Sequence, residues 1–321
     1  MPLFTIARNA FLESIRQPIH AVIVCAAVLA LVLNVNVAGY TLEDDNKLLI
    51  DLGLSTLFLS GLLMAAFTAT SVLAREIENK TVITVVSKPV ARPFVVLGKF
   101  CGVVGSSALA YWLLAVVFLL SVRHRVQSSV REEDIFDGPV ITFGLLAIGL
   151  TFLIAGLANY LYRWPFPSTF SLTGAFMATV ALAVVSCISR TWRLQSPTAG
   201  FDLQLTLALV LVFEAVVVLT AVAIAASTRL GQIATLLVCI GVFFVGLVGE
   251  YFLSLAVAGR NWMRPVAAVV PNLQFFWPAD ALTQGSTITA YYVGLVTLYA
   301  ACLIGAVMSL AVILFQTRDV G

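Results

Sequence analysis

The densest group of charged side chains in this sequence lies between Arg75 and Lys99, in the stretch REIENKTVITVVSKPVARPFVVLGK. This stretch joins two strongly apolar runs, so its charge indicates a segment held in water at a membrane face. Pro89 disfavours helical angles at the residue before it, and a helix through 82–86 is therefore expected to stop near Ser87. The chemistry available here is ion pairing with a partner, which gives orientation and specificity more than affinity.

Two carboxylates stand inside apolar runs, Glu214 near the middle of one and Glu250 close to the end of another. An ionisable residue at membrane depth costs about 2.5–3.5 kcal/mol on insertion scales and is a functional hypothesis by default. No Lys or Arg lies at matching depth, so we expect Glu214 to be protonated or hydrogen-bonded to Thr206, Thr220 or a polar group of another span. Its role is either to carry substrate or protons or to hold two helices together. Glu250 is expected to reach the outer interface, where water solvates it.

Catalytic and metal-binding patterns are absent from the sequence. It has only two histidines, His20 and His124, and its five cysteines lie in apolar runs without a CxxC pair. It contains no G-x-S-x-G and no H-E-x-x-H. The Gly98-Lys99 pair lacks the Walker A glycine five residues earlier, where Pro93 stands, so this motif does not bind ATP here. We therefore expect no catalytic residue, no metal and no cofactor in the chain itself.

The composition predicts an all-α polytopic membrane protein. Of its 321 residues, 61% are hydrophobic and only 11% charged, with a mean hydropathy of +1.04, whereas soluble domains carry roughly 25% charged residues. The net charge of +2, with no basic block, argues against nucleic acid as a partner. Because a span needs about 20 apolar residues, eight are expected, at roughly 19–39, 52–74, 98–122, 140–161, 167–189, 204–227, 231–254 and 290–315. The first run lacks an A-x-A cleavage site and should be retained as a span.

Segments outside the spans complete a single membrane domain over 1–321. Residues 1–18 are expected to form an amphipathic surface helix that Pro18 ends, with an apolar face of Phe4, Ala7, Phe11 and Ile15; the alternative is a solvated arm. The segment 255–289 is rich in aromatic residues and prolines, which predicts an outer interfacial segment. The loop 123–139 is also expected outside.

A stripe of small residues, Gly61, Ala65 and Ala69, recurs every four residues on the second span. Such a stripe allows close helix approach. It indicates either packing within one subunit or a seam between two subunits.

The distribution of Lys and Arg places the N-terminus and the 75–99 stretch in the cytoplasm, since basic residues flank the first three spans on that side. Beyond Lys99 the bias reverses under an eight-span count. Charge alone therefore leaves the orientation of the second half open.

The 75–99 stretch resembles the permease subunits of ABC transporters of the ABC-2 type. The features that carry the resemblance, in order, are Ala74-Arg75-Glu76-Ile77-Glu78, Thr81, Ser87-Lys88-Pro89-Val90, Arg92 and Leu97-Gly98-Lys99-Phe100. One position departs from the family pattern, because Lys80 precedes Thr81 where many members have Gly. The amphipathic N-terminal helix looks like the family's connecting helix, and Phe315-Gln316-Thr317-Arg318-Asp319 looks like its cytoplasmic tail.

The resemblance implies a cytoplasmic coupling helix seated on a separate ABC-type ATPase subunit, which binds the ATP. The partner-coupling residues are then Arg75, Glu76, Glu78, Lys80, Thr81, Ser87, Lys88, Pro89, Arg92, Gly98 and Lys99. It also implies a second permease copy or paralogue, export as the direction of transport, and a prokaryotic cytoplasmic membrane. Two alternatives stay open: a secondary transporter that uses Glu214 as a proton or ion carrier, and a membrane scaffold that transports nothing.

Overall fold

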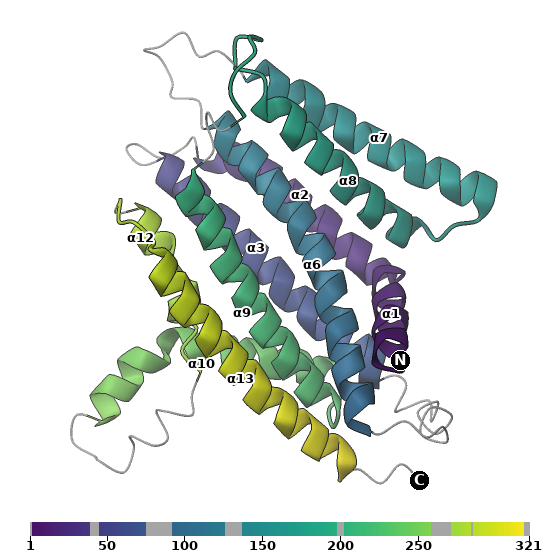
Figure 1. Cartoon of the computed structure of the whole chain (residues 1–321), viewed down its shortest axis with the longest axis vertical. Coiled ribbons are helices and arrows are strands. Elements are labelled where there is room, and N and C mark those ends of the chain that lie inside the picture. Colours follow the sequence, from purple (N-terminus) through teal and green to yellow (C-terminus); the bar gives the residue numbers. More distant parts are fainter. Residues whose placement is uncertain are drawn as a thin grey trace. The chain divides into compact units, whose positions relative to one another are not determined.

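The computed structural model of the chain describes residues 2–38, 45–74, 92–125, 137–197, 202–257, 271–283 and 285–317; the side chains of 249–257 and of a few residues at helix ends are not included. Over these ranges the chain is a set of helices (Figure 1), and the only extended pairing is an isolated bridge between Ile188 and Leu194. The expected all-α fold is therefore confirmed for the described part of the chain.

Within the described ranges the chain has eight long helices and four short elements. The long helices are α2 (Pro18–Ala38), α3 (Asp45–Ala69), α6 (Arg92–His124), α7 (Gly138–Tyr162), α8 (Phe166–Ser186), α9 (Leu203–Ser227), α10 (Gln232–Val257) and α13 (Ala290–Gln316). The short elements are α1 (Pro2–Ile15), the π-helical turn η1 (Thr70–Ala74), the 3-10 turn η3 (Gln274–Phe276) and α12 (Ala279–Thr283).

Seven of the described helices are long and apolar enough to cross a membrane, namely α2, α3, α6, α7, α8, α9 and α13. The apolar part of α10 that is described, Gln232–Val248, is shorter. Seven such helices fit a polytopic integral membrane protein, because a helix satisfies all its backbone hydrogen bonds internally in lipid.

Local sequence signals explain where several helices begin. Proline occupies the first turn of α7 and of α8, where its missing N–H costs nothing. The side chain of Asp137 caps α7 by accepting from the Val140 amide, and Thr289 caps α13 by accepting from the Tyr292 amide. Pro18 is the first residue of α2, so it both follows the end of α1 and begins the next helix.

The chain divides into two compact units. Unit 1 consists of Met1–Phe11, Gly61–Val104 and Val210–Gly321, and unit 2 consists of Leu12–Ser60 and Gly105–Leu209. Each unit has buried apolar side chains of its own, and each is described by itself below.

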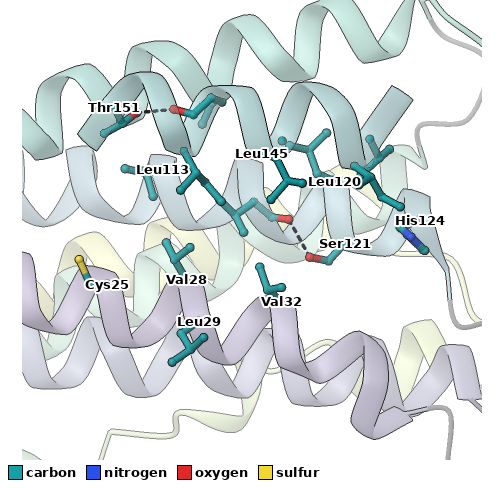
Figure 2. Close-up of a pocket in the computed structure, with 18 of the residues that line it drawn as sticks. Cys25, Val28, Leu29, Val32, Leu113, Leu120, Ser121, His124, Leu145 and Thr151 are labelled. Carbon is teal, nitrogen blue, oxygen red and sulfur yellow. Dashed lines mark hydrogen bonds between the residues drawn. The ribbon is translucent and has the colours of Figure 1, made fainter. Parts of the chain in front are cut away.

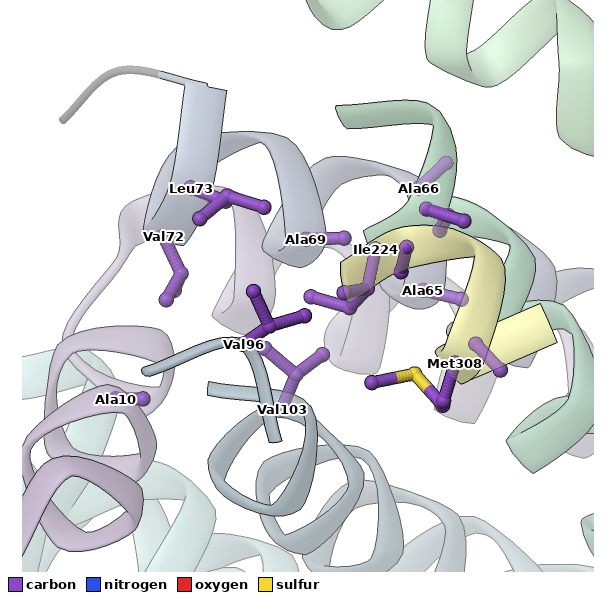
Figure 3. Close-up of a cluster of buried hydrophobic side chains, with 14 of the residues drawn as sticks. Ala10, Ala65, Ala66, Ala69, Val72, Leu73, Val96, Val103, Ile224 and Met308 are labelled. Atoms are coloured by element: carbon purple, nitrogen blue, oxygen red, sulfur yellow. The ribbon is translucent and has the colours of Figure 1, made fainter. Parts of the chain in front are cut away.

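The core of unit 1 joins residues far apart in the sequence (Figure 3). Buried side chains from α1, α3, η1, α6, α9, α10 and α13 form one cluster. Its members are Ala10, Ala65, Ala66, Ala69, Val72, Leu73, Val96, Val103, Ala221, Ala223, Ile224, Ala225, Cys239, Met308, Ala311 and Phe315. The last turns of α3, α9 and α13 and the first turns of α6 therefore gather at one end of this unit.

Within unit 1, α9 and α13 lie side by side and run in the same direction (Figure 1). Arg229, two residues past the end of α9, donates to the Leu314 carbonyl at 3.1 Å and to the Thr317 hydroxyl at 2.5 Å. A guanidinium at this position satisfies carbonyls at the C-terminus of α13 and interacts favourably with the helix dipole.

The small-residue stripe of α3 packs inside unit 1. A Cβ atom added at Gly61 would lie 2.3 Å from the Val216 side chain of α9, so the two helices touch at this glycine. Ala65 and Ala69 are fully buried in the core cluster. Packing within one subunit is therefore the reading that the geometry supports, and a seam between subunits along this stripe is ruled out because no part of the stripe is exposed.

Unit 2 is built around α7 and α8, an antiparallel hairpin whose helices are joined by a short turn (Figure 1). Val140 of α7 and Ala178 of α8 pack with Val116 and Leu120 from the second half of α6. The Tyr111 hydroxyl of α6 donates to the Leu209 carbonyl at 2.7 Å. These contacts hold α6, α7, α8 and the start of α9 together within the unit.

Candidate partner-coupling site

Most of the predicted partner-coupling residues lie outside the described part of the chain. These are Arg75, Glu76, Glu78, Lys80, Thr81, Ser87, Lys88 and Pro89, together with the helix expected through 82–86. Arg92 is the first residue of α6, although its side chain is not described. The site is therefore built here from Gly98, Lys99 and the elements around them.

Lys99 ties the two helices that flank the 75–91 segment. It lies two turns into α6, is only 5% exposed, and its ammonium group donates a 2.5 Å hydrogen bond to the carbonyl oxygen of Val72 in η1. Burying an ammonium group costs free energy unless the group is hydrogen-bonded, and the bond to the Val72 carbonyl offsets this cost. The bond therefore connects the end of α3, which precedes the 75–91 segment, to the start of α6, which follows it.

Gly98 and Gly102 bring α1 against the start of α6. A Cβ atom at Gly98 would lie 2.8 Å from the Ile6 side chain, and one at Gly102 would lie 2.5 Å from the Ala7 carbonyl oxygen. The two glycines are four residues apart and face the same side of α6, which permits helix axes to approach closely. Gly98 was predicted to belong to a partner-coupling motif, and within this chain its contact is with α1.

The N-terminal helix is present as α1, and most of its predicted apolar face is covered, because Ile15 is fully buried and Ala7 and Phe11 are half-buried. Ile6 and Ala10 contact α6 or lie in the core of unit 1, whereas Phe4 is 69% exposed. Gly102 of α6 meets the backbone of α1 at Ala7 and Phe11, so α1 packs on α6 through this side. Phe4 is left free to meet a membrane interface.

Glu214 of α9 is hydrogen-bonded to a neighbouring helix. The Thr297 hydroxyl of α13 donates to its Oε1 at 2.6 Å, while its Oε2 is buried and accepts from none of the described residues. The two partners expected by position differ from this one, because Thr206 and Thr220 both donate to carbonyl oxygens four residues earlier in the chain. The observed bond is of the expected kind, a polar group on another span, and it joins two parallel helices.

Glu250 lies in the last part of α10, where the structure describes a helical backbone but not the side chain.

The 3-10 turn η3 folds back onto α10 and α13. The Leu273 amide donates to the Gly246 carbonyl at 2.9 Å, and the Tyr292 hydroxyl donates to the Phe275 carbonyl at 2.8 Å. In the 255–289 segment, 255–257 therefore end α10, 271–283 contain η3 and the short helix α12, and 258–270 and 284 lie outside the described residues.

An ion cluster in unit 2 was not predicted from the sequence, in which 123–139 was expected only to be an outer loop. Asp137 is fully buried and pairs with Arg123 at 3.3 Å and Arg190 at 3.6 Å. Arg123 also donates to the carbonyls of Val185 and Ile188 at the end of α8. The signal that could have found it is the helix start Asp-Gly-Pro at 137–139, since Asp is a strong N-cap before proline.

The described residues form no group of His, Cys, Asp and Glu that could hold a metal ion. All five cysteines are free thiols, and of these only Cys239 is buried, in the core of unit 1. Around Lys99, buried packing and the hydrogen bond to the Val72 carbonyl link α1, η1 and α6.

Comparisons with protein families and with curated proteins found no match to this chain. The family resemblance therefore stands on the ordered motif of the 75–99 stretch.

Proposed function

We propose that this chain is the membrane-spanning permease subunit of an ABC transporter of the ABC-2 type. In this proposal a separate ABC-type ATPase binds and hydrolyses ATP, and the chain itself catalyses no reaction and holds no cofactor. It works with a second permease copy or a paralogue, exports its substrate, and resides in a prokaryotic cytoplasmic membrane. The support is the ordered motif between Arg75 and Lys99 together with the packing around it.

The observation that carries the proposal is the hydrogen bond between Lys99 and the Val72 carbonyl. A segment can transmit a push only if its two ends are anchored, since a slack loop absorbs the motion. Here the end of α3 and the start of α6 are tied to each other, and α1 is packed onto Gly98 and Gly102. A force applied to 75–91 by a partner would therefore act on α1, α3 and α6 together.

Eight spans are part of the proposal. Since α9 and α13 run in the same direction, the chain between them has to return across the membrane once. The helix available for this return is α10, whose backbone is helical for 26 residues and is thus long enough to span. With the N-terminus in the cytoplasm, eight spans also bring the C-terminus back to that side.

A proton- or ion-coupled transporter is the second candidate, and a single observation favours it. The buried Oε2 of Glu214 accepts no hydrogen bond from the described residues, so it could take a proton or a cation. The hydrogen bond from Thr297 to the other oxygen equally suits a structural role. The coupling segment favours the first candidate, because a secondary transporter has no use for a docking site for an ATPase.

The decisive experiment reverses two charges in the coupling segment. Glu76→Lys with Glu78→Lys should weaken binding of the ATPase or uncouple its hydrolysis from transport, because orientation at a mixed-charge interface depends on complementary charges. The measurements are pull-down of an ABC-type ATPase with the chain and substrate-stimulated ATP hydrolysis in liposomes. A cysteine at position 83 should also form a disulfide crosslink to that subunit.

The matched control is Glu132→Lys with Glu133→Lys, which makes the same change of charge in the loop expected on the opposite face. This control should bind and couple like the wild type. Wild-type binding and coupling in the 76/78 variant, together with no crosslink from position 83, would remove the coupling-helix assignment.

A further inference from the structure

Unit 2 contains a cavity of about 770 Å³ between α2, α6, α7 and α8 (Figure 2). Its walls are apolar along most of their length, with Val28 and Leu29 from α2, Leu113 from α6 and Leu145 from α7. A volume of this size lies within the range of about 300–1,000 Å³ that is usual for ligand pockets. The cavity is therefore large enough to hold a substantial apolar group.

The cavity lies along membrane-spanning helices and is open at the surface of the unit. Leu29 and Leu145, which line it from opposite sides, are 59% and 65% exposed. All four helices around it belong to the set that can cross a bilayer. The apolar group available at such a surface is the acyl chain of a lipid.

The length of the cavity matches one leaflet of a bilayer. It runs along α6 from Leu113 to His124, which is eleven residues or about 16 Å at about 1.5 Å per residue. One leaflet contributes about half of the roughly 30 Å hydrocarbon core. An acyl chain that enters at one membrane surface would therefore fill the cavity along its length.

The cavity has a polar end. Ser121 and His124 of α6 and Asn36 of α2 line it there, and the Ser121 hydroxyl donates to the Val117 carbonyl at 3.0 Å (Figure 2). Because α6 ends at His124, this end lies where the helix leaves the apolar layer. A lipid in the cavity would place its headgroup here.

Three arginines lie next to the residues of this polar end. The guanidinium of Arg190 donates to the carbonyls of Arg123 and His124, and Arg125 is exposed directly after the helix. Among the described residues here, Asp137 is the single carboxylate, and it is shared by Arg123 and Arg190. Counted over the described residues, the three arginines exceed this one carboxylate in charge, and their guanidinium groups are complementary to an anionic headgroup.

We propose that this cavity binds one anionic phospholipid, with an acyl chain between α2 and α7 and the headgroup at His124 and Arg125. The site is separate from the coupling segment and does not depend on the proposed function. It is a lipid site built into unit 2, and it would make the packing of α7 and α8 onto α6 depend on the composition of the membrane.

The glycines of α7 provide a matched pair of variants. Gly144 lines the cavity, and a Cβ atom added there meets nothing within 4 Å, so Gly144→Leu places a larger side chain into the cavity from a position where its first carbon has open space. Gly149, on the same helix, also has open space around an added Cβ but does not line the cavity. Gly149→Leu therefore makes the same change of volume and helix propensity outside the site.

The experiment uses the full chain in phosphatidylcholine liposomes that contain a trace of phosphatidylglycerol with a photoactivatable diazirine in its acyl chain. Peptide mass spectrometry after irradiation should find adducts on the faces of α2 and α7 around Leu29 and Leu145. Gly144→Leu should lower the yield at these positions by at least about fivefold, because the side chain occupies the space of the acyl chain. Gly149→Leu should label like the wild type.

Headgroup selectivity is read from competition on the wild-type chain. Unlabelled phosphatidylglycerol should suppress labelling more strongly than unlabelled phosphatidylcholine, and Arg125→Gln should reduce this difference. Equal labelling of the wild type, Gly144→Leu and Gly149→Leu would overturn the cavity as the site. Equal competition by the two lipids would overturn the anionic lipid as its occupant.

Discussion

The ammonium group of Lys99 and the carbonyl oxygen of Val72 are joined by a 2.5 Å hydrogen bond that closes a loop of 27 residues. Val72 belongs to a π-helical turn, a kind of element found frequently at functional sites. Lys99 is buried beside it, so a charged side chain lies in the interior where the two spans meet. The bond thus fixes the two ends of the 75–91 segment relative to each other.

The contribution of this bond can be measured with Lys99→Met, which keeps the length of the side chain and removes the donor. We expect a loss of about 1–3 kcal/mol in the free energy of unfolding, because the buried Val72 carbonyl loses a partner. Thermal unfolding in detergent measures this change. Lys47→Met removes the same charge from a lysine of α3 whose side chain is exposed, so water screens its interactions and stability should change little. Equal effects of the two variants would contradict a specific role of the bond.

The close approach of α1 to α6 predicts that Gly102→Ala is destabilising by about 1–3 kcal/mol. The added methyl group would lie 2.5 Å from the Ala7 carbonyl oxygen and 2.8 Å from the Phe11 amide nitrogen, so backbone has to move. The accessible readout is protease cleavage within α1, which should become faster as the helix detaches. Gly241→Ala is the control, since that glycine of α10 has open space around it. Cleavage at the wild-type rate in Gly102→Ala would show that α1 does not depend on this contact.

The hydrogen bond between Glu214 and Thr297 predicts different effects for two substitutions. Glu214→Gln should keep stability and transport, because the amide oxygen still accepts from the Thr297 hydroxyl. Thr297→Val removes the donor and should cost about 0.6–1.7 kcal/mol, the size measured for hydrogen bonds between spans. Unfolding in detergent and transport in liposomes are the two measurements. A folded Gln variant that has lost transport would instead assign a carrier role to Glu214, since Gln cannot change its charge.

The buried ion cluster predicts a large effect of Asp137→Asn. The amide keeps an acceptor for the cap of α7, whereas Arg123 and Arg190 lose their counter-charge. Breaking a buried pair in this way costs about 3–5 kcal/mol. Asp202→Asn is the matched control, because Asp202 also accepts from a backbone amide at a helix start but is exposed. Chemical or thermal unfolding should separate the two variants by several kcal/mol, and similar stabilities would show that the cluster is not stabilising.

The sequence by itself determined the class of the fold and most of the helix boundaries. Runs of about 20 apolar residues admit only a helix in a bilayer, and this physical constraint made α2, α6 and α9 predictable without any tertiary contact. Polar partners were less predictable, because a carboxylate accepts from whichever donor the packing supplies. Glu214 therefore took Thr297 of a distant helix instead of a threonine on its own.

Only the tertiary structure decided which faces of these helices touch. A long apolar helix has no polar face to mark its orientation, so the contact of Gly102 with α1 and the parallel course of α9 and α13 depend on side-chain packing. The same holds for Asp137, whose two arginine partners come from different helix ends and are brought together by the α7–α8 hairpin. Hydrophobicity sets how many helices lie in the membrane, whereas close packing and buried hydrogen bonds set how they fit.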